Sequence, residues 1–307
     1  MEIHQIRYFL AVADTLNFTK AAERCHVTQP ALTRAIQKLE EELGGPLLRR
    51  ERSLTHLTDL GRMMVPHLER VLEGSEAART TASGFLNLDK APLRLGVMCT
   101  IGPQRCVGLL AHFNRRHPGV EIELHESVPS RLLDELLEGR HDIAILALPE
   151  AIDGRFAAVP LYRERFVVAL PPGHRLGNSA GVRMTDLDGE RYLSRINCEY
   201  YDALRNLRRA QGVSFVDAFR SEREDWVQSM VLAGMGICFV PEYATLFPGI
   251  ETRPLVDPEI VREVCAVTVA GRRFSPAMVA FLGELRRHPW PGVGVIPEKA
   301  TPISTIR

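Results

Sequence analysis

The sequence predicts an α+β winged helix-turn-helix domain at the N-terminus, a long linker helix, and a two-lobed α/β domain beyond it. Three observations support this fold. Residues 18–42 read as two short amphipathic helices with a tight turn between them, and a single apolar stripe follows one helix over residues 58–86. From residue 93 onward, apolar strands alternate with amphipathic helices. A chain of 307 residues suits two or three domains.

The second of the two short helices has one apolar and one polar face. Thr19 is expected to cap the first helix and Thr28 the second, where Pro30 falls in the first turn and its missing N–H costs nothing. The apolar face comprises Leu32, Ile36, Leu39 and Leu43. The candidate DNA-contacting residues are Thr28, Gln29, Pro30, Thr33, Arg34, Gln37 and Lys38. Such a helix fits the major groove of double-stranded DNA, although any solvated helix face carries similar residues.

A two-stranded wing is expected after Gly44-Gly45-Pro46, with strands near residues 47–50 and 54–57. The wing carries three arginines, Arg49, Arg50 and Arg52. These side chains would reach the phosphate backbone or the minor groove, and the alternative is an ordinary solvated charge cluster. The position beside the expected recognition helix favours DNA contact.

Thr58 is expected to cap a long helix that ends near Leu86. Its apolar positions follow a heptad pattern: Met64, Leu68, Val71, Ser75, Ala78, Ala82 and Phe85. A helix of this length with one apolar stripe is not stable alone in water. The simplest partner is the same helix of a second subunit, which would give a two-fold dimer that binds paired operator half-sites.

Alternating strands and helices predict a parallel sheet with covering helices in each lobe. The first lobe is expected to contain strands at 93–98, 120–126 and 142–148, and helices at 103–117 and 129–138. A strand that starts at 165–170 crosses to the second lobe, which contains helices 200–211 and 224–233 and strands 215–219 and 236–240. A returning strand and a closing helix are expected at 261–270 and 275–288.

These patterns divide the chain into five parts. The expected parts are a DNA-binding domain at 1–58, a dimerising linker helix at 59–87, effector lobe I at 92–163 plus 268–290, effector lobe II at 164–267, and a loose Pro- and Gly-rich tail at 291–307.

Two lobes joined by two crossings enclose a cleft, and ligands of open α/β sheets bind beyond the carboxyl ends of the strands. The candidate residues of an effector or redox site are Cys99, Thr100, Ile101, Ser127, Ser130, Asn197 and Cys198. The alternative is that Thr100, Ser127 and Ser130 only cap helices.

Cys198 stands out among the six cysteines. It lies in a polar loop before an expected helix and near Arg195, and these features lower a thiol pKa. Cys238 and Cys265 lie in apolar strands and are expected in the core. The cysteines show neither a CxxC pair nor metal-ligand spacing, so no metal or other cofactor is expected.

The N-terminal motifs together resemble those of LysR-type transcriptional regulators. The matching segments are MEIHQIRYFLAVA at 1–13, FTKAA at 18–22, VTQPALT at 27–33, LEEELG at 39–44 and LTDLG at 57–61. In the effector region, residues 138–145 and 231–237 resemble landmarks of the same family. The resemblance implies a sequence-specific regulator of transcription at a promoter operator, with an effector domain similar to periplasmic binding proteins. It also implies a homotetramer and contact with RNA polymerase.

Within that family, the segments GVMCTIGP at 96–103 and Asn197-Cys198 resemble the peroxide-sensing branch. In that branch a threonine and a cysteine sense peroxide, and Thr100 and Cys198 occupy the matching positions. This sequence departs from the branch at the residues of its disulfide switch. Leu207 stands where the branch has its resolving cysteine, and Asn197 and Ala218 stand where it has two histidines. The local disulfide is therefore absent.

Two effector classes remain open. Cys198 could form a sulfenic acid, a mixed disulfide, or a bond with a distant cysteine such as Cys99. It could instead line a metabolite pocket without a redox role.

Two other functional classes fit less well. An α/β enzyme is disfavoured because the sequence lacks GxGxxG, P-loop, GxSxG and HExxH motifs in the right context. A solute-binding protein is disfavoured because no signal peptide precedes the DNA-binding pattern, and no apolar run is long enough for a membrane helix. A cytoplasmic location is therefore expected.

The 38 basic and 38 acidic side chains balance, which argues against non-specific coating of nucleic acid but not against a local DNA-binding face.

Overall fold

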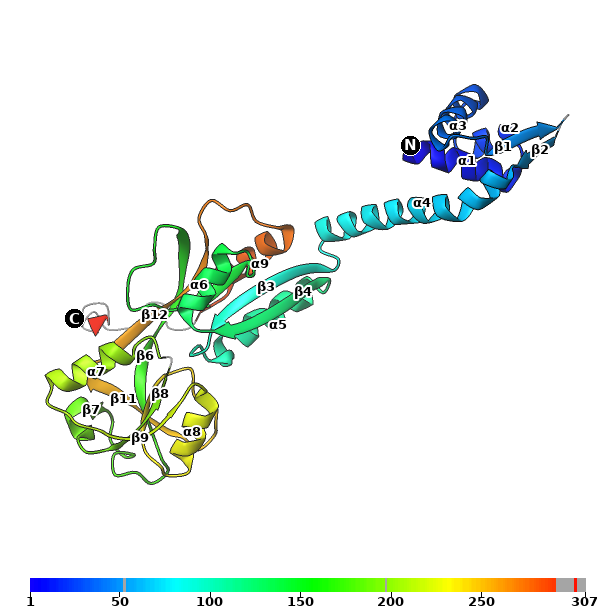
Figure 1. The fold of residues 1–307 in the computed structure, drawn as a ribbon. Coiled ribbons are helices and arrows are strands. Elements are labelled where there is room, and N and C mark those ends of the chain that lie inside the picture. Colours follow the sequence, from blue (N-terminus) through cyan, green and yellow to red (C-terminus); the bar gives the residue numbers. More distant parts are fainter. Residues whose placement is uncertain (52–53, 197, 291–300, 303–307) are drawn as a thin grey trace. The chain divides into compact units, whose positions relative to one another are not determined.

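The computed structural model describes residues 1–51, 54–196, 198–290 and 301–302 (Figure 1). It contains two compact units, Met1–Asn87 and Leu88–Arg307. The N-terminal unit and each lobe of the C-terminal unit have hydrophobic clusters of their own.

The N-terminal unit begins with α1 (Ile3–Thr15), α2 (Phe18–Arg24) and α3 (Gln29–Leu43). The predicted helix-turn-helix is confirmed, but the prediction that Thr19 caps α2 is wrong. Asn17 is the N-cap, because its Oδ1 accepts the N–H groups of Thr19 and Lys20 at 2.9 and 3.1 Å. Thr28 does occupy the N-cap position of α3, although its side chain makes no capping hydrogen bond.

The predicted wing is confirmed as an antiparallel pair, β1 (Leu48–Glu51) and β2 (Leu54–Leu57). Glu40 on α3 fixes the start of the wing, because its Oε1 accepts the N–H groups of Leu47 and Leu48 at 2.8 and 3.0 Å. The wing is thus hydrogen-bonded to α3.

The long helix α4 (Asp59–Leu86) is confirmed, and Thr58 caps it by accepting the Gly61 N–H at 2.9 Å. Part of its apolar stripe, predicted to be a dimer seam throughout, is instead buried within the N-terminal unit. Leu68 is only 1% exposed and belongs to the core of the N-terminal unit, because the first turns of α4 pack on that core. Val71 and Phe85 further along are 40% and 37% exposed.

Lobe I of the C-terminal unit contains the predicted βαβαβ pattern. Its parallel strands are β3 (Ala91–Met98), β4 (Val120–Ser127) and β5 (Ile143–Leu146), and its first helices are α5 (Pro103–Arg116) and α6 (Pro129–Leu137). Figure 1 shows β3 and β4 side by side. The returning strand β12 (Ile260–Val269) pairs antiparallel with β5, and α9 (Pro276–Arg287) packs into the same core.

The strand that crosses between the lobes is longer than predicted. It was expected to start at Arg165, but β6 spans Phe156–Leu170. Its first part pairs with β12, and its last part pairs with β10 (Cys238–Pro241) and β11 (Glu251–Asp257). One continuous strand therefore carries the chain from one lobe to the other.

Lobe II also contains elements that the sequence patterns missed. These are β7 (Val182–Arg183), the 3₁₀ turn η1 (Met184–Leu187), β8 (Arg191–Arg195) and β11. The predicted elements are present as α7 (Tyr201–Ala210), β9 (Val216–Ser221) and α8 (Glu224–Leu232). β8 and β9 form a parallel pair, and β13 (Thr301–Pro302) pairs with β12. The rest of the predicted tail, residues 291–300 and 303–307, lies outside the described residues.

Among the helices in the described ranges, none combines the length and the apolar character that crossing a membrane requires.

Candidate functional site

The outer face of α3 is accessible in the N-terminal unit. Leu32, Ile36 and Leu39 are at most 2% exposed and form the inner face. On the outer face, Thr33 is half-buried, and the exposed candidates are Thr28, Gln29, Pro30, Arg34, Gln37 and Lys38. The helix therefore presents hydrogen-bonding side chains of the kinds that contact base edges and phosphates.

Side-chain contacts orient part of this face and of the wing. Gln29 Oε1 accepts the Thr19 hydroxyl at 3.5 Å, and Arg34 Nε donates to the Pro30 carbonyl at 3.4 Å. In the wing, the Arg50 guanidinium lies 4.1 Å from the centroid of the Phe18 ring, and Arg49 pairs with Glu51. Arg50 thus attaches the wing to the start of α2. Arg52 lies outside the described residues.

Cys198 lies in the loop between β8 and α7, at a cavity of about 420 Å³ with its open mouth included. Thr100 from lobe I also lines this cavity, so the structure brings together two residues that the sequence placed 98 positions apart. The charged side chains that line it are Arg195, Glu199, Glu224 and Arg262.

Arg262 is the central group of this cavity. It lies on β12 directly opposite Glu164 on β6, and both side chains are 0% exposed. Its Nη2 donates to Glu164 Oε1 at 2.8 Å, and its Nη1 donates to Glu199 Oε1 at 3.0 Å and to Thr100 Oγ1 at 2.7 Å. Burial alone would lower the pKa of Arg262, but Glu164 and Glu199 reverse this effect and raise it. One guanidinium therefore links both crossing strands, lobe I and the Cys198 loop.

A second guanidinium joins the loop to Cys99. Arg195 Nη1 donates to Glu224 Oε2 and Nη2 donates to Cys99 Sγ, both at 3.1 Å. Burial raises the pKa of Cys99, and the neighbouring Arg195 opposes that effect. Cys99 is therefore held beside the cavity by the same arginine that precedes Cys198.

The expected lowering of the Cys198 pKa is wrong. Burial, followed by the adjacent Glu199 carboxylate, raises the pKa of Cys198 from 9.0 to about 12. Arg195 and Arg262 act in the lowering direction, but each is already paired with carboxylates. Burial also raises the pKa of Cys106 to about 12 and that of Cys265 to about 11. In this conformation the charge environment does not make Cys198 the most acidic thiol.

The other predicted effector residues lie elsewhere. Ile101 is 5% exposed and belongs to the lobe I core, and Ser130 is an exposed residue of α6. Ser127 ends β4, where its carbonyl accepts the Cys99 N–H at 3.0 Å. None of the three is among the described residues that line the Cys198 cavity. Asn197 lies outside the described residues.

Sequence reasoning missed Glu164, Glu199, Glu224 and Arg262. A weak signal existed for two of them: Arg262 and Glu164 each lie in a mostly apolar strand, although further charged residues adjoin both, namely Glu263 in β12 and Arg163 and Arg165 in β6. A charged residue in such a strand requires a buried partner. Their pairing depends on the β6–β12 register, which periodicity does not reveal. Leu207, at the position of the absent resolving cysteine, is 8% exposed and packs in the lobe II core.

Comparisons with known proteins agree with this architecture. Residues 3–62 match the family described as "Bacterial regulatory helix-turn-helix protein, lysR family", and residues 87–290 match the "LysR substrate binding domain". A relative from Dickeya chrysanthemi, named "Hydrogen peroxide-inducible genes activator", is 31% identical over 298 residues, which cover 94% of this chain and 96% of the relative.

Solved structures show the same fold. A full-length OxyR variant from Pseudomonas aeruginosa is 28% identical with a TM-score of 0.62, and the match covers 93% of this chain and all of that one. Full-length CbnR in complex with its target DNA is 23% identical with a TM-score of 0.68, and the match covers 94% and 99% of the two chains. The chain therefore belongs to the LysR family of DNA-binding transcriptional regulators and is not an enzyme.

Proposed function

We propose that this regulator responds to hydrogen peroxide through Cys198 and converts the reaction into altered binding of promoter DNA. The observation that carries the proposal is the position of Cys198 at a cavity shared with Thr100 and the buried Arg262. The relative from Dickeya chrysanthemi, whose name refers to peroxide-inducible genes, supports the choice of oxidant.

The proposed reaction begins at the Cys198 sulfur. The deprotonated sulfur attacks one peroxide oxygen, the O–O bond breaks, and the second oxygen leaves as hydroxide, which takes up a proton to form water. The sulfur is oxidised by two electrons to a sulfenic acid, and the peroxide is reduced. Because the pKa of Cys198 is about 12, only a small thiolate fraction reacts at neutral pH unless the cavity changes conformation.

The product differs from a local disulfide because Leu207 offers no second thiol. A low-molecular-weight thiol can condense with the sulfenic acid, which forms a mixed disulfide and releases water. Either product adds atoms beside Glu199, which hydrogen-bonds to Arg262 and Thr100. We infer that the added atoms displace this hydrogen-bonded group and so change how lobe I meets lobe II.

A small metabolite is the second candidate signal, and one observation favours it. Glu199 Oε2 is buried without a hydrogen-bond partner in the part of the chain that the structure describes. A buried acceptor of this kind favours a ligand with an N–H or O–H donor. A metabolite of this type would bind Glu199 and Thr100 and would leave Cys198 unmodified.

The two candidates are separated by the modification of each cysteine under a graded dose of peroxide. We expect Cys198 to be modified at a lower dose than Cys238, which is 2% exposed in β10. The variant Cys198→Ser should lose the transcriptional response to peroxide, whereas Cys25→Ser, in the N-terminal unit, should keep it. Equal modification of Cys198 and Cys238, or a full response by Cys198→Ser, would exclude the peroxide proposal.

The proposed sites for DNA binding and for assembly lie in the N-terminal unit. We propose that the outer face of α3 reads base edges while Arg49, Arg50 and Arg52 contact phosphates. The exposed part of the α4 stripe, including Val71 and Phe85, would pair with a second copy, and two such dimers would form a homotetramer. We further propose that the assembly acts in the cytoplasm and contacts RNA polymerase at the promoter.

A further inference from the structure

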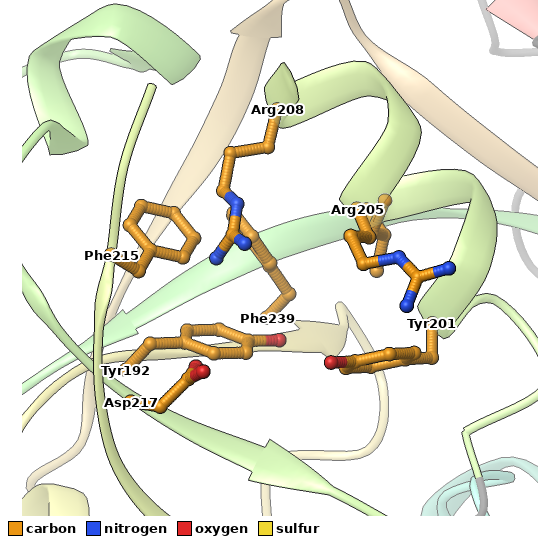
Figure 2. A pocket seen from close by; sticks show the side chains of 8 residues that line it. Tyr192, Tyr201, Arg205, Arg208, Phe215, Asp217 and Phe239 are labelled. Carbon is orange, nitrogen blue, oxygen red and sulfur yellow. The ribbon is translucent and has the colours of Figure 1, made fainter. Parts of the chain in front are cut away.

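Lobe II contains a second cavity, of about 290 Å³ with its mouth included, on the α7 side of β8 (Figure 2). Tyr192, Tyr201, Leu204 and Phe239 line both this cavity and the Cys198 cavity. The residues that line only the second cavity are Arg205, Arg208, Phe215 and Asp217. This second cavity is called the arginine–aromatic cavity below.

Three rings form one apolar wall of the arginine–aromatic cavity. The rings of Tyr192 and Phe215 are stacked, with centroids 5.0 Å apart and an interplanar angle of 26°. The Phe239 centroid lies 5.6 Å from that of Tyr192 and 6.0 Å from that of Phe215. Tyr201 contributes a fourth ring, and Figure 2 shows its hydroxyl pointing toward the hydroxyl of Tyr192. A flat aromatic ligand has favourable stacking partners here.

Two guanidiniums extend from α7 above these rings (Figure 2). The Arg208 guanidinium carbon lies 4.8 Å from the Phe215 centroid, and that of Arg205 lies 5.5 Å from the Tyr201 centroid. The Nε atoms of both are buried without a hydrogen-bond partner among the described residues. Buried donors are normally satisfied, so two unpaired Nε–H groups in one cavity point to a missing acceptor.

The charges of the lining residues indicate the charge of the missing acceptor. Asp217, the cross-strand neighbour of Tyr192, is the single carboxylate among the lining residues, against two guanidiniums. Arg205 also pairs at 2.8 Å with Asp202, which is 77% exposed and therefore screened by water. Arg208 lies over the Phe215 ring and shares no ion pair with another described residue. The cavity therefore favours a ligand with one negative charge.

We propose that the arginine–aromatic cavity binds a single-ring aromatic carboxylate. The ring would stack on the Tyr192–Phe215–Phe239 wall, and the carboxylate would accept hydrogen bonds from Arg208 and Arg205, since guanidinium pairs with carboxylate in a planar, two-point arrangement. The three neighbouring rings of the wall, with centroids 5.0–6.0 Å apart, suit one ligand ring rather than two. Binding of this ligand would not require a reaction at Cys198.

The test measures binding of benzoate to the full-length protein by isothermal titration calorimetry. Benzamide is the neutral analogue and acetate is the anion without a ring. Benzoate should bind at least about tenfold more tightly than either, because only benzoate offers both the charge and the ring. Failure of benzoate to bind, or equal binding of benzamide, would overturn the proposal.

Single-residue variants test whether benzoate binds in the arginine–aromatic cavity. Arg208→Gln should weaken benzoate binding by about tenfold or more, whereas Arg209→Gln, an exposed neighbour on the same helix, should bind as the parent does. Phe215→Leu should weaken benzoate while leaving the weak binding of acetate unchanged. Thermal unfolding checks that each variant is folded. If a folded Arg208→Gln variant binds benzoate like the parent, Arg208 only packs on Phe215 and the proposal is wrong.

Discussion

Replacement of Glu199 by glutamine should make Cys198 more reactive. Glu199 acts on the thiol in two ways: its negative charge is the second largest cause that raises the pKa of Cys198, and it pairs with Arg262, which acts in the lowering direction. Glu199→Gln removes the negative charge and leaves Arg262 with Glu164 as its one carboxylate partner in the described structure. Both changes favour the thiolate.

The size of the effect is bounded by the structure. The pKa of Cys198 is raised from 9.0 to about 12, so complete relief would be three units. Burial is the largest cause and remains in the variant, so we expect a decrease of about one unit, which corresponds to about tenfold more thiolate at neutral pH. The glutamine Oε1 can still accept the hydrogen bond from Arg262, so the variant loses the charge of the acceptor rather than the bond. This loss should cost about 1 kcal/mol of stability, because Glu199 is only 7% exposed.

The assay is the rate of Cys198 alkylation by iodoacetamide at neutral pH, followed by mass spectrometry of the Cys198 peptide. Asp202→Asn is the matched control, because it removes a 77% exposed carboxylate from the first turn of α7. The control should react like the parent. A Glu199→Gln variant that reacts no faster would refute the electrostatic argument, and one that reacts more slowly would identify Glu199 as a base for the thiol.

Three further predictions concern pH, DNA binding and assembly. The rate of Cys198 alkylation should rise about tenfold per pH unit from pH 7 to pH 10 without a plateau, since a folded-state pKa of about 12 keeps the thiol mostly protonated over this range. A plateau near pH 9 would contradict the raised pKa. In gel-shift titrations, Arg34→Ala should cost ~1–3 kcal/mol of discrimination for the operator. Arg50→Ala should instead weaken binding to all sequences alike and lower the salt slope by about one; loss of discrimination with Arg50→Ala but not Arg34→Ala would reverse the two roles. By sedimentation, the combined change of Val71 and Phe85 to glutamate should dissociate the α4 pair, since both apolar side chains are exposed in the isolated subunit; an unchanged oligomer would place the interface elsewhere.

Elements with strong local signals could be predicted from the sequence. The 3.6-residue periodicity gave α4, and the turn residues with alternating apolar positions gave the wing. The cap of α2 could not be predicted correctly, because Asn17 and Thr19 are both good capping residues and the backbone conformation decides between them. Leu68 belonged to the predicted heptad stripe, yet packing within its own subunit buries it.

The candidate site was predictable only in part. Placing Thr100 at a strand end and Cys198 in the loop before a helix of the facing lobe required only the α/β pattern, and both residues line the cavity. The pKa of Cys198 was predicted in the wrong direction because the local sequence does not reveal its burial, which is the largest cause of the raised pKa. Nor does it show that Arg195 pairs with Glu224 and that Arg262 pairs with Glu164 and Glu199. Long-range pairing thus determines the electrostatics of the site.

The most direct test of peroxide sensing through Cys198 is a footprint of the full-length protein on its promoter DNA before and after peroxide. The parent footprint should change with peroxide and return after treatment with a thiol reductant, because sulfenic acids and mixed disulfides are reversible. The Cys198→Ser variant should bind the same DNA and show no change. A parent footprint that peroxide leaves unaltered, or a Cys198→Ser footprint that changes as the parent's does, would contradict the role of this thiol.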